Sequence, residues 1–162
     1  MKTLVTLLDK FLAGALITAM AAILLTVIWQ VISRYLLADP ASVTEELSRF
    51  LLIWIGILGA AYAYKEKAHL GFNLIVNRQK RAVRRVLLTF VELSVIIFCA
   101  AVMSYGGVEL VSITLELEQI SAALGIKMGF VYVVLPISGG LIILYAIINI
   151  INLWHNEQEV TE

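Results

Sequence analysis

Long apolar runs separated by short polar stretches predict four membrane-spanning helices. The first run, residues 11–32, carries no charge, and further apolar runs cover residues 47–64, 86–108 and 128–154. A helix needs about 20 apolar residues to cross the hydrocarbon core of a bilayer. Because backbone in lipid must satisfy its own hydrogen bonds, we expect these runs to be helices. The prediction is an all-α integral membrane domain over residues 1–162, with the first span as an uncleaved anchor.

The second span has a marked beginning. Pro40 precedes Ser42-x-x-Glu45, a pattern in which the serine oxygen accepts a backbone N–H and the glutamate reaches back. We expect a helix to begin at Ser42, and its first turns can form an interfacial segment before residue 47. Glu45 and Arg49 are four residues apart, so they share one helix face and can form an ion pair.

Small residues continue that face, and we call them the small-residue stripe: Gly56, Gly59, Ala60 and Ala63. Small side chains at this spacing let another helix approach closely, which is how helices associate where lipid removes the hydrophobic drive. We therefore expect the small-residue stripe to pack against another protein helix.

The two longer connections differ in character. Residues 65–85 hold seven of the twelve basic residues and include His69, so we expect a basic turn. Residues 109–127 alternate polar and apolar positions, a pattern typical of a strand. A lone strand at a membrane surface would leave its backbone unpaired, so we favour a helical continuation that breaks at Gly125. Three glutamates lie in this stretch: Glu109, Glu116 and Glu118.

The fourth run is longer than a bilayer requires, so its helix must tilt or bend. Proline interrupts the hydrogen-bond ladder of a helix, and glycine pairs also allow a kink. Pro136 and Gly139-Gly140 therefore mark the expected place of a bend.

Composition supports a membrane protein. Hydrophobic residues make up 61% of the chain and charged residues 15%, and the mean hydropathy is +0.95. Soluble domains average about one-quarter charged residues. The net charge of zero leaves no basic surface for nucleic acid, so we expect lipid and other membrane helices as partners. The single cysteine, Cys99, excludes an internal disulfide.

Basic residues predict the orientation. The stretches before the first span and between the second and third hold nine Lys and Arg residues, whereas the other side holds three. Positive residues favour the cytoplasmic side, so both termini are expected in the cytoplasm. We see no inverted repeat, the usual sequence mark of a self-sufficient secondary transporter.

Candidate chemistry is sparse. Glu92 lies inside the third span, about 10 Å from its start at 1.5 Å per residue, and we favour a structural hydrogen bond or ion pair over proton coupling. His69 and His155 lie outside the spans, which argues against haem held between helices. The sequence offers no catalytic motif, metal ligand set or cofactor site. Two alternatives stay open: a proton-coupled exporter that uses Glu92, and a general membrane assembly protein.

Four charged residues are expected to form a polar cluster on the periplasmic side: Arg34, Glu45, Glu46 and Arg49. Charges beside a short span stay ionised only where water or opposite charges reach them. Glu45 can pair with Arg49 along the helix, which leaves Glu46 to meet Arg34 or a group on another protein. We expect this cluster to be a subunit contact.

Several motifs together resemble one family. They are Arg34-Tyr35, Pro40, Glu45-Glu46 with Arg49 and Trp54, the glycine- and alanine-rich run that ends in a basic turn with His69, and the segment SAALGIKMGFVYVVLPISGG. In their order and spacing they are similar to the small membrane subunit of tripartite ATP-independent periplasmic (TRAP) transporters. The chain departs from the family pattern at Val43, where a tryptophan is common, and at Asn73, where an aspartate is common.

The resemblance implies a division of labour. In that family a large membrane subunit moves the solute with sodium ions by an elevator-like motion, and a soluble periplasmic protein captures the solute. The small subunit assists. The resemblance thus implies an auxiliary subunit in a bacterial inner membrane, with the large subunit and the binding protein as partners and an organic anion, such as a dicarboxylate or a sialic acid, as the solute.

Overall fold

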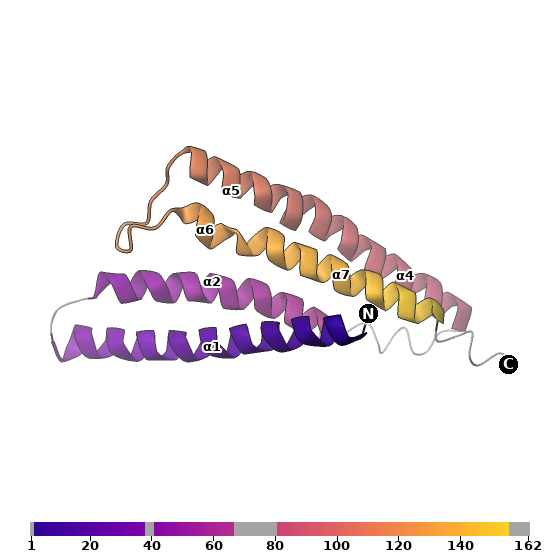
Figure 1. The fold of residues 1–162 in the computed structure, drawn as a ribbon, viewed down its shortest axis with the longest axis horizontal. Helices are drawn as coiled ribbons and strands as arrows, with labels where there is room; N and C mark the ends of the chain where they lie inside the picture. The colour runs from indigo at the N-terminus through magenta and orange to yellow at the C-terminus, as the bar shows by residue number, and fades with distance from the viewer. Residues whose placement is uncertain (1, 38–40, 67–80, 156–162) are drawn as a thin grey trace.

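The computed structural model describes residues 2–37, 41–66 and 81–155, with side chains from residue 5 and, in the last range, from residue 83. Four long helical segments make up this part of the chain (Figure 1). Their elements are α1 (Lys2–Tyr35), α2 (Ser42–Lys65), α4 (Arg81–Phe98), the π-helix η2 (Cys99–Tyr105), α5 (Gly106–Glu116), α6 (Met128–Tyr132) and α7 (Val134–His155).

The helices pack as two hairpins that meet through their inner members. Helix α1 packs along α2, α2 packs on α7, and α7 in turn packs on α4 and η2, while α5 packs on α6. The end of α1, the beginning of α2 and the connector 117–127 lie at the same end of the bundle (Figure 1). Helices α2 and α7 therefore lie in the middle, and α1 and the α4–α5 segment lie at the two edges.

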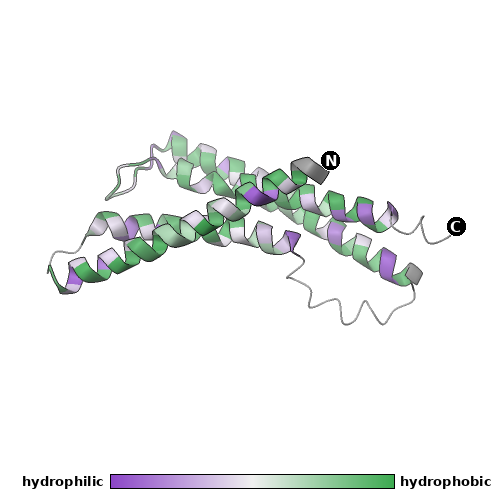
Figure 2. Ribbon diagram, turned by 60° about the horizontal axis from the view of Figure 1, so that its bottom comes forward, coloured by the Kyte–Doolittle hydropathy of each residue, from purple (hydrophilic) through white to green (hydrophobic). Residues whose placement is uncertain are grey.

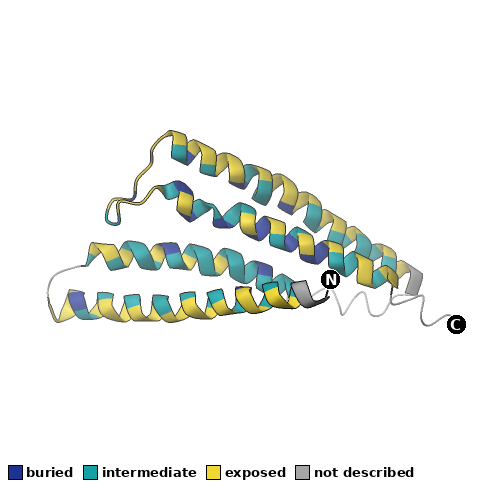
Figure 3. Ribbon diagram, viewed as in Figure 1, coloured by how far each residue is buried: buried dark blue, intermediate teal, exposed yellow. Residues whose placement is uncertain are grey.

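The predicted all-α class with four membrane-length helices is confirmed. Each of the four segments is long and apolar enough to cross a membrane. Hydrophobic residues occur along all four helical segments (Figure 2), and many of the large ones are exposed. Full burial is confined to a few positions, most of them on α7, where Val134, Ser138 and Ala146 have no exposed surface (Figure 3). A surface of this kind suits contact with lipid.

The beginning of α2 differs from the prediction. The helix begins at Ser42, but its N-cap residue is Ala41 and no side chain caps it, so the expected Ser42–Glu45 capping box does not form. Ser42 lies one residue too far into the helix for its oxygen to take the cap position. The Thr44 hydroxyl instead donates back to the Ala41 carbonyl at 2.9 Å. Helix α2 then runs without interruption to Lys65.

The third segment confirms helix over strand but ends earlier than predicted. It continues through α5 to Glu116 and stops there, ahead of Gly125. The connector 117–127 then folds back on itself, with an isolated antiparallel bridge between Ile120 and Lys127. Glu118 and Gly125 have φ angles of 48° and 67°, so both turns of the connector use left-handed backbone.

The predicted bend in the fourth segment is present one turn ahead of Pro136. Helix α6 ends at Tyr132 and α7 begins at Val134. Proline lacks the N–H that the Tyr132 carbonyl would otherwise accept, which weakens the ladder at this point. Helix α5 approaches the bend closely, because a Cβ on Gly107 would lie 2.9 Å from Pro136 Cδ.

We predict that Gly139→Ala destabilises the fold, whereas Gly140→Ala does not. A Cβ at position 139 would meet Met103 Cβ at 2.8 Å and Ser104 Oγ at 2.9 Å, whereas one at position 140 would meet nothing within 4 Å. Overpacking of this kind typically costs about 1–3 kcal/mol. Thermal unfolding of the two purified variants in detergent checks this, and equal melting temperatures would contradict it.

Candidate functional site

The predicted Glu45–Arg49 ion pair is present on the outer side of α2. Arg49 Nη2 lies 2.8 Å from Glu45 Oε1, and the two side chains are 66% and 56% exposed. An exposed pair of this kind contributes about 0.3–0.5 kcal/mol. Arg34, at the end of α1, is also exposed and lines a small cavity with Gln30, Ala41 and Glu45. Arg34 therefore lies toward Glu45 rather than Glu46.

Glu46 corrects the sequence prediction, because it is occupied within the chain. Its Oε2 atom accepts hydrogen bonds from Ser121 Oγ at 3.0 Å and from the backbone N–H groups of Ala123 and Leu124 at 2.8 Å each. These donors belong to the connector 117–127, about 75 residues away along the chain. Glu46 therefore anchors the connector to α2, and its Oε2 atom is directed to this connector and not to Arg34.

Two further hydrogen bonds join α2 to the fourth segment. Trp54 Nε1 donates to the Val131 carbonyl at 3.1 Å, next to the helix break. Ser138 Oγ, which is fully buried, donates to the Ile57 carbonyl at 2.8 Å. Trp54 lies too deep in the span to be an interfacial anchor, and its hydrogen bond to Val131 gives it a structural role instead.

Glu92 carries the hydrogen bonds favoured from the sequence. The Tyr64 hydroxyl donates to Glu92 Oε2, and Asn149 Nδ2 donates to Oε1 at 3.2 Å. The three residues come from α2, α4 and α7. This carboxylate therefore joins three helices, as is usual for polar groups inside membrane bundles.

Asp9 joins α1 to α2 and α7. Its Oδ1 atom accepts a hydrogen bond from the Tyr145 hydroxyl at 2.7 Å, and its Oδ2 atom lies 3.4 Å from Lys65 Nζ. Lys65 also pairs with Glu66 at 2.6 Å. Neither Asp9 nor Tyr145 stood out in the sequence, because nothing in the pattern places residues from the two ends of the chain together.

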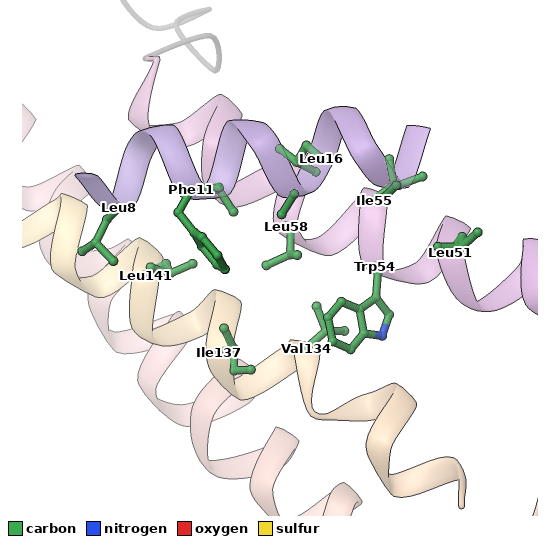
Figure 4. A pocket seen from close by; sticks show the side chains of 13 residues that line it. Leu8, Phe11, Leu16, Leu51, Trp54, Ile55, Leu58, Val134, Ile137 and Leu141 are labelled. Atoms are coloured by element: carbon green, nitrogen blue, oxygen red, sulfur yellow. The ribbon is translucent and has the colours of Figure 1, made fainter. Parts of the chain in front are cut away.

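A cavity of about 380 Å³ lies between α1, α2 and α7 (Figure 4). Phe11, Leu58, Ile137 and Leu141 border it, and its lining is apolar apart from the edge of the Trp54 indole. Nothing in this lining can pair with a charged solute. Within the described ranges, no three His, Cys, Asp or Glu residues gather as a metal site would require.

The small-residue stripe is open within this chain. A Cβ at Gly56 or Gly59 would meet nothing within 4 Å. Gly56 is exposed, and Gly59, Ala60 and Ala63 are half-buried. The role of the stripe, like that of the Arg34, Glu45 and Arg49 charges, therefore stays a prediction. Pro40 and His69 lie outside the described residues.

Fold and contacts together define a four-helix membrane protein in which Asp9, Glu46 and Glu92 join separate parts of the chain. A comparison with family models identifies the family to which the chain belongs. Residues 10–156 match the model of the DctQ component of tripartite ATP-independent periplasmic transporters, and the chain belongs to this family.

Curated relatives agree. A TRAP transporter small permease protein of Haemophilus influenzae is 27% identical over 142 residues, which are 88% of this chain and 86% of the relative. The sialic acid TRAP transporter small permease protein of Vibrio cholerae is 31% identical over 54% of this chain and 50% of its own length. The isethionate TRAP transporter permease protein of Oleidesulfovibrio alaskensis is 29% identical over 78% of this chain but only 21% of its own length. The chain is thus related to a component of transporters.

We predict that Glu46→Ala loosens the connector and that Glu45→Ala does not. Removing the carboxylate leaves two backbone donors without their acceptor, and hydrogen bonds to a charged group are worth about 1.5–3 kcal/mol each. Hydrogen exchange at the amides of Ala123 and Leu124 should become at least about tenfold faster in Glu46→Ala. Unchanged exchange at these two amides would mean that the connector holds its shape without Glu46.

We predict that Glu92→Gln keeps the fold and that Glu92→Leu does not. Glutamine retains an acceptor for Asn149 and an amide that can donate to the Tyr64 oxygen. Leucine leaves both groups without a partner, and an unsatisfied buried polar group costs about 1–3 kcal/mol of stability. Thermal unfolding in detergent compares the two variants. Uptake by the assembled transporter should survive Glu92→Gln, and its loss with assembly intact would favour proton coupling through Glu92.

Proposed function

We propose that this chain is an auxiliary, scaffold-type membrane subunit of a sodium-coupled, binding-protein-dependent transporter that imports organic anions, and that it is not an enzyme. One observation carries most weight: the carboxylates of Asp9, Glu46 and Glu92 are all engaged in contacts between elements of this chain. Polar groups that recognise a solute would instead converge on a cavity. The apolar lining of the cavity between α1, α2 and α7 also favours a structural role.

The proposed solute class rests on the relatives. One relative is named for sialic acid and another for isethionate, and both compounds are organic anions, the first a carboxylate and the second a sulfonate. These two relatives are 31% and 29% identical to this chain and share a class of solute, which supports import of an organic anion here. The small permease is one component of such a transporter, so we place the choice of solute in the other components.

The proposed partners are a large membrane subunit, a soluble periplasmic binding protein and lipid. The match to a permease protein almost five times longer than the matched region supports the large subunit, since this chain corresponds to only 21% of that protein. The open small-residue stripe and the exposed Glu45–Arg49 pair on α2 offer a surface for it. We place the complex in a bacterial inner membrane, and the count of basic residues supports an orientation with both termini in the cytoplasm.

Reconstitution tests this function. Vesicles that contain the large subunit, with the binding protein supplied outside, should accumulate a labelled organic anion under an inward sodium gradient only when this chain is present. Vesicles with this chain alone should move no cation when a pH gradient is applied. Uptake that is equally fast without the chain would refute the scaffold role, and cation flux through the chain alone would favour the exporter.

We predict that Gly59→Leu weakens binding of the large subunit and leaves this chain folded. A Cβ at position 59 would meet nothing within 4 Å in this chain, so we expect the added bulk to act mainly on a partner helix. Overpacking a helix contact costs about 1–3 kcal/mol, so co-purification of the large subunit should fall about tenfold. Gly14→Leu on α1, which also has open space and is exposed, is the matched control. Normal assembly of Gly59→Leu would mean that the small-residue stripe faces lipid.

A further inference from the structure

One side of α5 carries polar groups that nothing in the described part of this chain covers. Tyr105, the last residue of η2, continues this side of the helix. Tyr105, Glu109, Ser112 and Glu116 are spaced by four, three and four residues, so they share one helix face, which we call the Glu109 face. All four are exposed, Tyr105 to 72%. The opposite side of α5 is the packed one, since Gly107 and Thr114 are buried there.

The contacts of α5 with α6 and α7 show the level of Glu109 along the bundle axis, which is within the apolar part. A Cβ on Gly107 would meet Leu135 and Pro136, and one on Gly129 would meet Leu115. Glu109 therefore lies at about the level of residue 134. Lys127 is the last charged residue before α6, seven positions earlier, so Glu109 lies about 10 Å inward from its level at 1.5 Å per residue.

The position of α2 gives a similar depth for Glu109. Val134 and Trp54 border the same apolar cavity, and Trp54 is five positions, or about 7.5 Å, inside Arg49. A glutamate side chain is shorter than the lysine and arginine chains that reach an interface from such depths. The Glu109 carboxylate is therefore set among apolar positions, on the outside of the bundle.

No hydrogen bond or ion pair reaches Glu109 from the residues that the structure describes. Ionisable groups at this depth in a membrane normally face protein or water and pair with one another. The exposed side of α1 shows the contrast: between Phe11 and Ile32 it carries no charge, and Ile17, Leu24 and Ile28 are exposed there. The α1 side suits lipid, whereas the Glu109 face does not.

We propose that the Glu109 face docks a membrane helix of the large subunit, and that this helix presents an arginine or lysine to the Glu109 carboxylate. The assignment rests on the proposed function, and it adds a second contact to the one expected at the small-residue stripe. Tyr105 and Ser112 flank the carboxylate with hydroxyl groups, and hydroxyls that donate across helices are a regular part of membrane-helix contacts.

Charge favours a basic helix of the large subunit over a second copy of this chain or a lipid headgroup. A second copy of the chain in a symmetric contact would bring two Glu109 carboxylates together. Among the described residues, the exposed cations Arg34, Arg49 and Lys127 lie toward one end of the bundle, and Lys10 and Arg84 lie toward the other. A lipid ammonium lies at the headgroup level, outside the depth of Glu109. A basic side chain on a neighbouring helix has neither difficulty.

Co-purification of the tagged chain with the large subunit is the first test. We expect Glu109→Lys to reduce the recovered large subunit at least about tenfold, because it places two like charges together in a low dielectric. Glu109→Gln should cause a smaller loss. Glu118→Lys, the same charge reversal at an exposed connector position, should retain the large subunit fully. An arginine- or lysine-to-glutamate change in the large subunit should restore binding to Glu109→Lys.

Photo-crosslinking is the second test and does not depend on the charge variants. A benzophenone side chain in place of Tyr105 should form an adduct with the large subunit, and one in place of Ile17 should not. Full recovery of the large subunit with Glu109→Lys, or adducts at position 105 with lipid or a second copy only, would overturn the assignment. If the unaltered chain recovers no large subunit, the proposed function itself fails.

Discussion

Close approach between helices, rather than burial of apolar surface, holds this bundle together. Lipid is as apolar as leucine, so helices gain little by hiding leucine from it, and short contacts and interhelical hydrogen bonds must supply the specificity. Helix α7 shows both: Gly139 lets the backbone of η2 come near, and Ser138 donates to a carbonyl of α2.

Three glutamates illustrate how position decides the use of one residue type. Glu46 accepts three hydrogen bonds from the connector, and Glu92 accepts two from neighbouring helices. Glu109 lies on a face of α5 that no described part of the chain covers. Because a carboxylate in a membrane protein must find donors or cations, the first two complete the fold of the chain itself, and the third directs attention to a partner.

This arrangement fits a component that supports transport instead of conducting it. The carboxylates of Asp9, Glu46 and Glu92 are engaged by the chain itself, and the cavity between α1, α2 and α7 is apolar. The surface of the bundle divides into an α1 side suited to lipid, an α2 side with small residues and the Glu45–Arg49 pair, and an α5 side with Glu109. A scaffold of this kind presents different faces to lipid and to protein.

The amino-acid sequence by itself determined the four helices, the ion pair of Glu45 with Arg49 and the bend near Pro136. Each depends on residues within one or two turns or on the length of an apolar run, because backbone in lipid has no alternative to the helix. Only the tertiary structure decided that Glu46 anchors the connector, that Asp9 meets Tyr145 and that Ser42 caps nothing. The first two contacts join residues 75 or more positions apart, so no local pattern encodes them. The capping depends on which residue takes the N-cap position, and Ala41 takes it here.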